Sequence, residues 1–217
     1  GTVGVITYLR TDSTRISEEA DAAARSYIAE TYGEAYVAEG TKAKSADKKI
    51  QDAHEAIRPT DITRTPAAIK DSLSRDQFRL YQLIWKRFTA SRMQPAKYET
   101  TAVKIGAGEY CFTVSTARIA FDGFRSVYVE AEEEKEESNV LVGHLSMDSV
   151  LTKEEFDPKQ HFTQPPAHYT EASLVKTMEE LGIGRPSTYA PTISLILGRR
   201  YITKEGKNLY LTEIGEV

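Results

Sequence analysis

The chain has 217 residues, enough for one large domain or two to three small ones, and 40% of them are hydrophobic. Its formal net charge of −4 argues against a simple basic protein that coats nucleic acid. The single cysteine excludes an intrachain disulfide and fits a reducing compartment such as the cytoplasm. No apolar run reaches the length of a membrane span. The chain starts at Gly1, with neither a Met nor a signal peptide, and we expect it to be part of a longer protein.

Residues 1–95 are predicted to form a mostly helical domain, which opens with a short strand over the apolar, β-rich residues 3–9. Ser17 has the features of an N-cap for a first helix. Residues 74–77, Ser-Arg-Asp-Gln, have the form of a capping box. Aromatic residues recur behind this box at spacings of three and four, which predicts a strongly amphipathic helix that ends near Met93.

Residues 96–163 are predicted to form a small antiparallel β domain, because short β-rich segments alternate there with glycines. The segments are residues 102–105, 110–115, 126–130 and 140–145. Cys111 lies in the apolar run of the second segment, so we expect its thiol to be buried. The acidic run over residues 130–137 is predicted to be a solvated loop.

Residues 164–217 are predicted to form two helices followed by a β-hairpin. Gly182 closes the first helix, and residues 201–203 and 209–211 flank the polar turn of the hairpin. Helix, helix, hairpin is the order of a winged helix, an architecture that docks on DNA. The same pattern fits an ordinary helical hairpin with a β-tail equally well. The whole chain is therefore predicted to be an α+β protein of several domains.

A first group of reactive side chains lies in the segment Ile-Thr-Tyr-Leu-Arg-Thr-Asp-Ser-Thr over residues 6–14. Because alternate residues of a strand share a face, Tyr8 and Arg10 are predicted to point the same way. An arginine binds a phosphate as a fork and offsets the charge that grows on its oxygens, while Asp12 would orient that arginine. A nucleophilic tyrosine needs such a cation to lose its proton. A tyrosine near an arginine is more often structural, so this segment alone leaves both interpretations open.

A second group is Ala-His-Glu-Ala-Ile-Arg-Pro-Thr over residues 53–60, which places His54, Glu55 and Arg58 within five positions. One interpretation is a grip on a phosphate, in which the histidine donates a hydrogen bond. The other is a helix end closed by a salt bridge. No second His or Cys lies at metal-ligand spacing, so the sequence does not predict a zinc site.

The third group is Gly-Ile-Gly-Arg-Pro-Ser-Thr-Tyr over residues 182–189. Its glycines let a backbone approach closely, and Ser187 or Thr188 would cap the next helix. Arg185 would sit beside a helix N-terminus that attracts an anion, as in a phosphate or single-strand contact. The alternative is a plain turn between helices. The glycine spacing does not fit a nucleotide-binding P-loop.

In this order, three stretches resemble the type IA DNA topoisomerases, and the bacterial DNA topoisomerase I enzymes most closely. They read ITYLRTDSTRIS, DAHEAIRPT and HFTQPPAHYTEASLVKTMEELGIGRPSTYAPTI, and RIAFDGFRSVY is also similar. The resemblance implies that Tyr8 attacks one DNA strand and forms a 5′-phosphotyrosyl link, and that Arg10 stabilises the scissile phosphate. With the interpretations above, it leads us to predict a set of DNA-binding residues: Asp12, His54, Arg58, Arg185, Ser187 and Thr188.

The resemblance also implies a division of the chain into three domains. Residues 1–95 would be part of a lid domain that carries the catalytic tyrosine, residues 96–163 part of a β arch, and residues 164–217 part of a winged-helix base. The family uses Mg²⁺ through a Toprim domain with an Asp-x-Asp pattern, which this sequence lacks. We therefore expect a monomeric fragment that binds no cofactor and does not relax DNA by itself. The full-length enzyme would relax negatively supercoiled DNA without ATP and would prefer single-stranded DNA.

A different class of protein stays open as the alternative. It is a non-catalytic winged-helix DNA-binding protein, in which Tyr8 has a structural role only.

Overall fold

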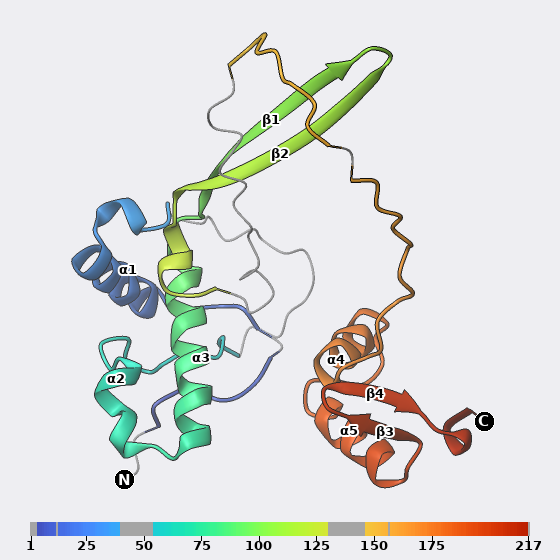
Figure 1. Ribbon diagram of the computed structural model, residues 1–217. Helices are drawn as coiled ribbons and strands as arrows, with labels where there is room; N and C mark the ends of the chain where they lie inside the picture. The colour runs from blue at the N-terminus through green and yellow to red at the C-terminus, as the bar shows by residue number, and fades with distance from the viewer. Residues whose placement is uncertain (1–3, 12, 40–53, 130–145, 156, 217) are drawn as a thin grey trace. The chain divides into compact units, whose positions relative to one another are not determined.

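The computed structural model describes residues 4–11, 13–39, 54–129, 146–155 and 157–216. These residues form an α+β protein with five α-helices and two small antiparallel sheets of two strands each (Figure 1). The chain divides into two compact units, which comprise Gly1–Leu9 with Ser13–Leu151, and Arg10–Asp12 with Thr152–Val217. No helix within the described ranges is both long and apolar enough to cross a membrane.

The first unit begins with helix α1 (Glu18–Tyr32), which starts where the sequence predicts. The hydroxyl of its N-cap, Ser17, accepts a hydrogen bond from the Ala20 N–H at 3.3 Å. Gly33 ends the helix with a φ of 102°, a left-handed conformation that a glycine adopts without a Cβ penalty. The 3₁₀ turn η1 (Glu34–Tyr36) follows directly.

Helix α3 (Arg75–Ser91) follows the short helix α2 (Pro66–Ile69) and the 3₁₀ turn η2 (Lys70–Ser72). The predicted capping box is confirmed, because Ser74 and Gln77 exchange side-chain to backbone hydrogen bonds. The C-cap is at position 92, one residue before the predicted end.

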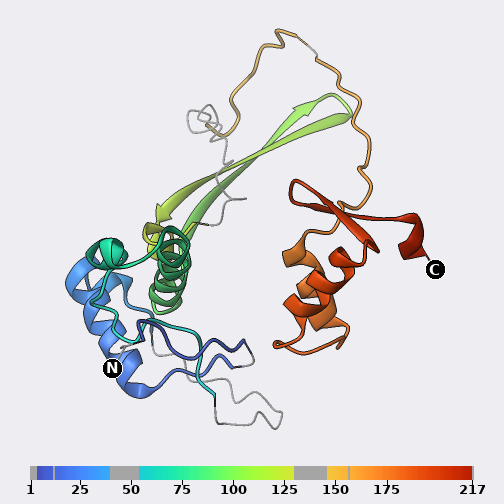
Figure 2. The same ribbon diagram turned by 90° about the horizontal axis from the view of Figure 1, so that it is seen from below.

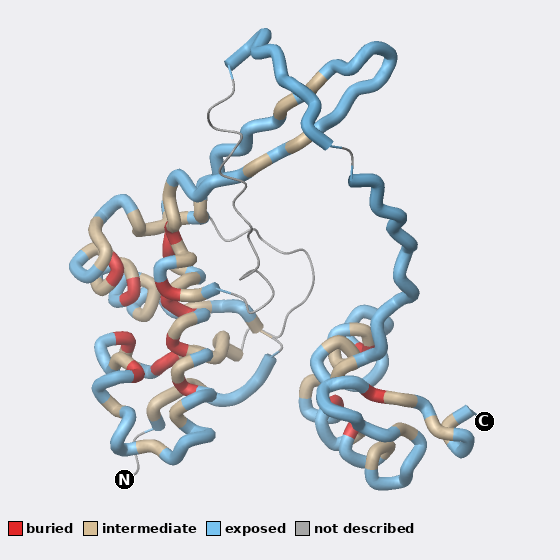
Figure 3. Tube along the Cα trace, viewed as in Figure 1, coloured by how far each residue is buried: buried red, intermediate tan, exposed pale blue. Residues whose placement is uncertain are grey.

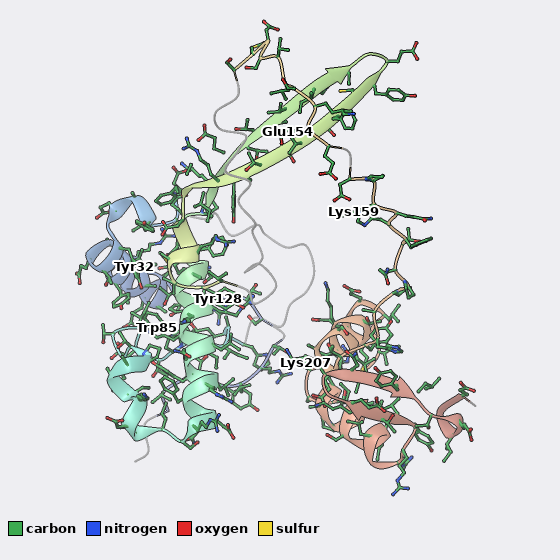
Figure 4. All side chains as sticks on the ribbon, viewed as in Figure 1. Tyr32, Trp85, Tyr128, Glu154, Lys159 and Lys207 are labelled. Atoms are coloured by element: carbon green, nitrogen blue, oxygen red, sulfur yellow. The ribbon has the colours of Figure 1, made fainter. Side chains whose placement is uncertain are left out.

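The hydrophobic core of the first unit lies between these helices. Trp85 of α3, which is labelled in Figure 4, lies in this core. It donates its indole N–H to the Ile62 carbonyl at 2.9 Å, and its ring meets Tyr27 of α1 edge-on at 5.8 Å between ring centroids. Buried positions gather in this helical part (Figure 3). The buried core residues are Ala24, Ile28, Ile62, Tyr81, Trp85, Phe88, Met93 and Val127.

Strands β1 (Lys97–Ala107) and β2 (Tyr110–Phe121) pair as one long hairpin, which projects beyond the helices as a twisted ribbon (Figures 1 and 2). Its turn pairs Ala107 with Tyr110. Most residues of both strands are exposed. Cys111 is one of them, so the predicted burial of its thiol is wrong.

Two further strands of the predicted β domain have different outcomes. Of the predicted strand over residues 126–130, the described residues 126–129 do not extend the sheet, because η3 (Gly123–Ser126) forms a 3₁₀ turn and Val127 is buried in the helical core. The attraction of that core for an apolar side chain outweighs the local β preference. The predicted strand over residues 140–145 and the acidic run over residues 130–137 lie outside the described residues.

The hairpin is joined to the helices at its base. The Tyr36 hydroxyl donates to the Asp122 carboxylate at 2.7 Å, and the Phe124 N–H donates to the Gln94 carbonyl at 2.9 Å. Gly123 lies between these contacts with a φ of 50°, and a Cβ on it would collide with the Gln94 carbonyl oxygen. Only glycine fits this close approach of two backbone segments.

The second unit has the predicted order of two helices and a hairpin. It contains α4 (Glu171–Glu180), α5 (Tyr189–Gly198), β3 (Ile202–Glu205) and β4 (Asn208–Leu211). A reciprocal capping box of Thr170 and Ser173 starts α4. Its small core is formed by Met178, Tyr189, Ile193 and Leu209.

Candidate active site around Tyr8

Tyr8 lies immediately after a short antiparallel pairing between two distant segments. The Thr7 N–H donates to the Arg58 carbonyl at 2.9 Å, and an isolated bridge joins Ile6 to Pro59. The predicted strand over residues 3–9 is therefore wrong in extent, because the single partner segment offers only this bridge and a strand needs a longer ladder. The tyrosine itself follows the pairing with 79% of its surface exposed.

The side chain of Thr7 strengthens this attachment directly beside the tyrosine. Its hydroxyl donates to the Ala56 carbonyl at 2.8 Å and accepts from the Arg58 N–H at 3.0 Å. With the backbone bond and a longer hydroxyl bond to the Arg58 carbonyl at 3.4 Å, four hydrogen bonds hold the residue that precedes Tyr8. The hydroxyl thus serves as the hydrogen-bond partner of two backbone groups, the Ala56 carbonyl and the Arg58 N–H.

The chain on the other side of Tyr8 returns to the same partner. The Ser13 hydroxyl donates to the His54 carbonyl at 2.8 Å, and the Ala56 N–H donates to the Arg15 carbonyl at 2.7 Å. We call the described residues 8–11 the Tyr8 loop and residues 54–60 the holding segment. The holding segment therefore binds both flanks of the Tyr8 loop.

Glu55 and Arg58 form an ion pair inside the holding segment. The guanidinium donates to both carboxylate oxygens, from Nε at 3.0 Å and from Nη2 at 3.2 Å, and its Nη1 donates to the Pro59 carbonyl at 3.0 Å. The carboxylate also accepts from the backbone N–H of Ser17, the N-cap of α1, at 2.9 Å. The predicted salt bridge is present, but residues 54–58 are not helical.

The electrostatics of this pair keep the carboxyl of Glu55 ionised. Burial raises its pKa, but the hydrogen bonds from Arg58 and Ser17 and the charge of the guanidinium lower it further than that. The net result is a pKa below the ordinary value of 4.5. Only 13% of the Arg58 side chain and 27% of the Glu55 side chain are exposed, so solvent screens this pair less than a surface pair.

The other predicted residues of this region differ in how far the structure places them. Arg10 is exposed and belongs to the second unit, so no distance to Tyr8 is defined. Neither residue lies in a strand, so the alternation from which a shared face was predicted does not apply. Asp12 lies outside the described residues. The DNA contacts expected of His54 and Arg58 stay predictions.

In the second unit, the third motif forms a tight turn before α5. The Thr188 hydroxyl accepts from the Arg185 N–H at 2.8 Å and donates to the Arg185 carbonyl at 3.0 Å. Thr188 occupies the N-cap position of α5, one of the two predicted positions, but its hydroxyl is engaged in the turn and makes no capping hydrogen bond to the helix. Arg185 and Ser187 are exposed on the same turn. Gly184 takes a φ of 79° in close contact with Thr188.

Sequence reasoning missed the residues that hold the Tyr8 loop. It assigned no role to Thr7 and did not predict that Ser13 contacts the holding segment. The only available signal was the acid–base pair at a spacing of three in the second motif. Within the described ranges no cluster of three or more His, Cys, Asp or Glu residues is arranged to hold a metal ion.

Comparison with known proteins defines the class to which this chain belongs. A family model described as DNA topoisomerase matches residues 2–217, and the chain belongs to the type IA DNA topoisomerase family. Among solved structures, the full-length topoisomerase I of Thermotoga maritima is similar, with 39% sequence identity and a TM-score of 0.71. The match covers 97% of this chain and 33% of that chain, so the chain spans about a third of the length of that enzyme.

Proposed function

We propose that this chain carries the nucleophile of a type IA DNA topoisomerase. The Tyr8 phenol oxygen would attack a backbone phosphorus of one DNA strand and lose its proton. The bond from phosphorus to the 3′ oxygen breaks, and that oxygen leaves as a hydroxyl, while the 5′ phosphate stays bound to the tyrosine. Attack by the 3′ hydroxyl reverses each change. The observation that carries this proposal is an exposed phenol on a loop held at both flanks by one segment.

The proposed roles of the other residues follow from their charge and from the resemblance to the family. Arg10 would stabilise the charge that grows on the phosphate, and Asp12 and His54 would contact DNA near it. In the second unit, the exposed turn with Arg185, Ser187 and Thr188 before α5 would contact a phosphate of a single strand. We interpret this unit as part of a winged-helix base, and the hairpin as part of the β arch.

We further propose the context in which the site acts. The full-length, cytoplasmic enzyme would act as a monomer and relax negatively supercoiled DNA. It needs no ATP, because the phosphotyrosyl bond conserves the energy of the phosphodiester that it replaces. Mg²⁺ would bind to the full-length enzyme outside the described residues, so this chain alone would not relax DNA. Access of Tyr8 to its phosphate requires an unpaired strand, so single-stranded DNA would be preferred.

The test is Tyr8→Phe in the full-length enzyme, with Tyr110→Phe as the matched control. Tyr110 is as exposed as Tyr8, at 76% against 79%, but lies at the tip of the hairpin. We expect Tyr8→Phe to lose plasmid relaxation and the covalent DNA adduct while it keeps its affinity for single-stranded DNA. Tyr110→Phe should keep all three. Relaxation or an adduct in Tyr8→Phe would refute the assignment.

One observation favours a second candidate, a non-catalytic DNA-binding protein. The order of helix, helix and hairpin in the second unit is that of a winged helix whether or not the chain is catalytic. No adduct from the unaltered full-length protein, together with tighter binding of duplex than of single strands, would support this candidate.

A further inference from the structure

We infer that Glu55 is a positioning residue for the reaction of Tyr8, an inference that rests on the proposed function of the tyrosine. The carboxylate binds Arg58, whose backbone holds the flank before Tyr8, and Ser17, which lies at the end of the flank after Tyr8. It acts through these two residues and not by contact with the reacting atoms.

The carboxylate of Glu55 accepts hydrogen bonds from two separate parts of the chain. One oxygen, Oε1, accepts from the Ser17 N–H at 2.9 Å and from Arg58 Nε at 3.0 Å, and the other accepts from Arg58 Nη2 at 3.2 Å. Ser17 ends the C-terminal flank and starts α1. Glu55 therefore joins that flank to the guanidinium of the holding segment.

The backbone of Arg58 binds Thr7, the residue that precedes Tyr8. Its N–H donates to the Thr7 hydroxyl, and its carbonyl accepts from the Thr7 N–H. The residue whose side chain binds Glu55 is thus the residue whose backbone holds the chain directly before Tyr8. Through Glu55 and Arg58, the holding segment therefore connects the flank before the Tyr8 loop to the flank after it.

Partial burial of the ion pair makes the loss of these hydrogen bonds costly. The Arg58 side chain is only 13% exposed, so removing the carboxylate would leave the guanidinium without its main partner in a partly dry site. The Ser17 N–H would lose its acceptor as well. The flanks would then sample more positions, and a displacement of about 1 Å costs an in-line reaction on the order of 100-fold in rate.

A direct contact of Glu55 with DNA is a poorer explanation. An ionised carboxylate repels a phosphate, and both of its oxygens already accept hydrogen bonds from the protein. The lowered pKa also makes it a weak proton donor near neutral pH. Glu55 therefore affects the reaction through the positions of Arg58 and Ser17.

The chain offers a matched control in Asp61 and Arg64. This pair also has a spacing of three, at 3.5 Å, and lies just beyond the holding segment. Asp61 accepts hydrogen bonds from the Thr63 N–H and hydroxyl, and both side chains of the ion pair are nearly half exposed, at 45% and 44%. Substitution of Asp61 by Asn therefore removes a carboxylate from an ion pair, as Glu55→Gln does, but this ion pair does not bind the flanks of the Tyr8 loop.

The experiment compares Glu55→Gln and Asp61→Asn in the full-length enzyme. Single-turnover cleavage of a labelled single-stranded oligonucleotide at saturating enzyme gives a rate constant and an amplitude, and fluorescence anisotropy gives Kd. We expect Glu55→Gln to lower the rate constant about 10- to 100-fold, with Kd changed less than about 2-fold. Asp61→Asn should keep the rate. A purely structural role would lower the amplitude through loss of folded enzyme and leave the rate constant unchanged.

Coupling between the two partners gives a second readout. Arg58→Gln should lower the cleavage rate as Glu55→Gln does, and the double variant should be no slower than the slower single variant. If Glu55→Gln does not fold, Glu55→Asp replaces it, because the shorter side chain keeps the charge but cannot reach both partners. An unchanged cleavage rate in the folded Glu55 variant, with Tyr8→Phe inactive, would refute this inference and leave the proposed function intact. Activity in Tyr8→Phe would refute the function itself.

Discussion

Thr7→Val tests how firmly the chain beside Tyr8 is held. Valine keeps the β-branched shape of threonine and removes only the hydroxyl. The two shorter of the three hydrogen bonds that are lost, at 2.8 Å to the Ala56 carbonyl and at 3.0 Å from the Arg58 N–H, are both partly buried. At about 1 kcal/mol each, their loss weakens the attachment by about 2 kcal/mol. The backbone bond from the Thr7 N–H to the Arg58 carbonyl remains, so the flank loosens without detaching.

The assay is hydrogen exchange of peptides that cover residues 54–60 in the full-length enzyme, beside the single-turnover cleavage rate. A loss of about 2 kcal/mol corresponds to about 30-fold faster local exchange, since each 1.4 kcal/mol is a factor of ten. Thr7→Ser keeps the hydroxyl and should restore both protection and cleavage. Thr60→Val is the control, because it removes one exposed bond, to the Gly4 carbonyl at 3.0 Å, at the far end of the pairing.

Two results would refute this reasoning. Unchanged exchange of residues 54–60 in Thr7→Val would mean that the hydroxyl does not hold the flank. Faster exchange with an unchanged cleavage rate would mean that the flank is held but does not position Tyr8.

The remaining predictions concern the hairpin base and acid stability. Gly123→Ala should lower the melting temperature of the chain by more than Gly108→Ala, because both glycines have a positive φ but only Gly123 faces a backbone clash; an equal drop would show that the clash is relieved at no cost. The carboxyls of Glu55 and Asp21 have lowered pKa values, since hydrogen bonds from their arginine partners outweigh the opposing effect of burial. A lowered folded-state pKa stabilises above the unfolded value and is lost as pH falls through the folded value. The unaltered chain should therefore be more stable than Glu55→Gln by a constant amount from pH 7 to about 5, and this difference should shrink below pH 4.5. Thermal melts across pH measure it, and a difference that grows in acid would contradict the lowered pKa.

Local structure was largely predictable from sequence, because the interactions that determine it lie within a few residues. The capping box of Ser74 and Gln77 starts α3, and Ser17 starts α1. The aromatic spacing of α3 predicted the face that carries the buried Trp85. Each of these features depends on groups one helical turn apart, and a periodic pattern records them.

Features that depend on distant neighbours were predicted incorrectly. Val127 has the local preference of a strand but is buried in the helical core. Cys111 lies in an apolar run that usually indicates burial, yet most residues of the hairpin that carries it are exposed. Local composition states what a side chain favours, but the packing of the whole unit decides whether a partner is available.

The candidate site combines both cases. The sequence by itself identified Tyr8 and the motif around Glu55 as groups of reactive side chains, and their resemblance to one family joined them in a single function. Only the tertiary structure brought Thr7 against Ala56, 49 positions away, and gave both flanks of the Tyr8 loop the same partner. Hydrogen bonds between segments so far apart leave no periodic trace in a sequence, because any pair of hydroxyl and carbonyl groups can form them once the fold has placed the two together.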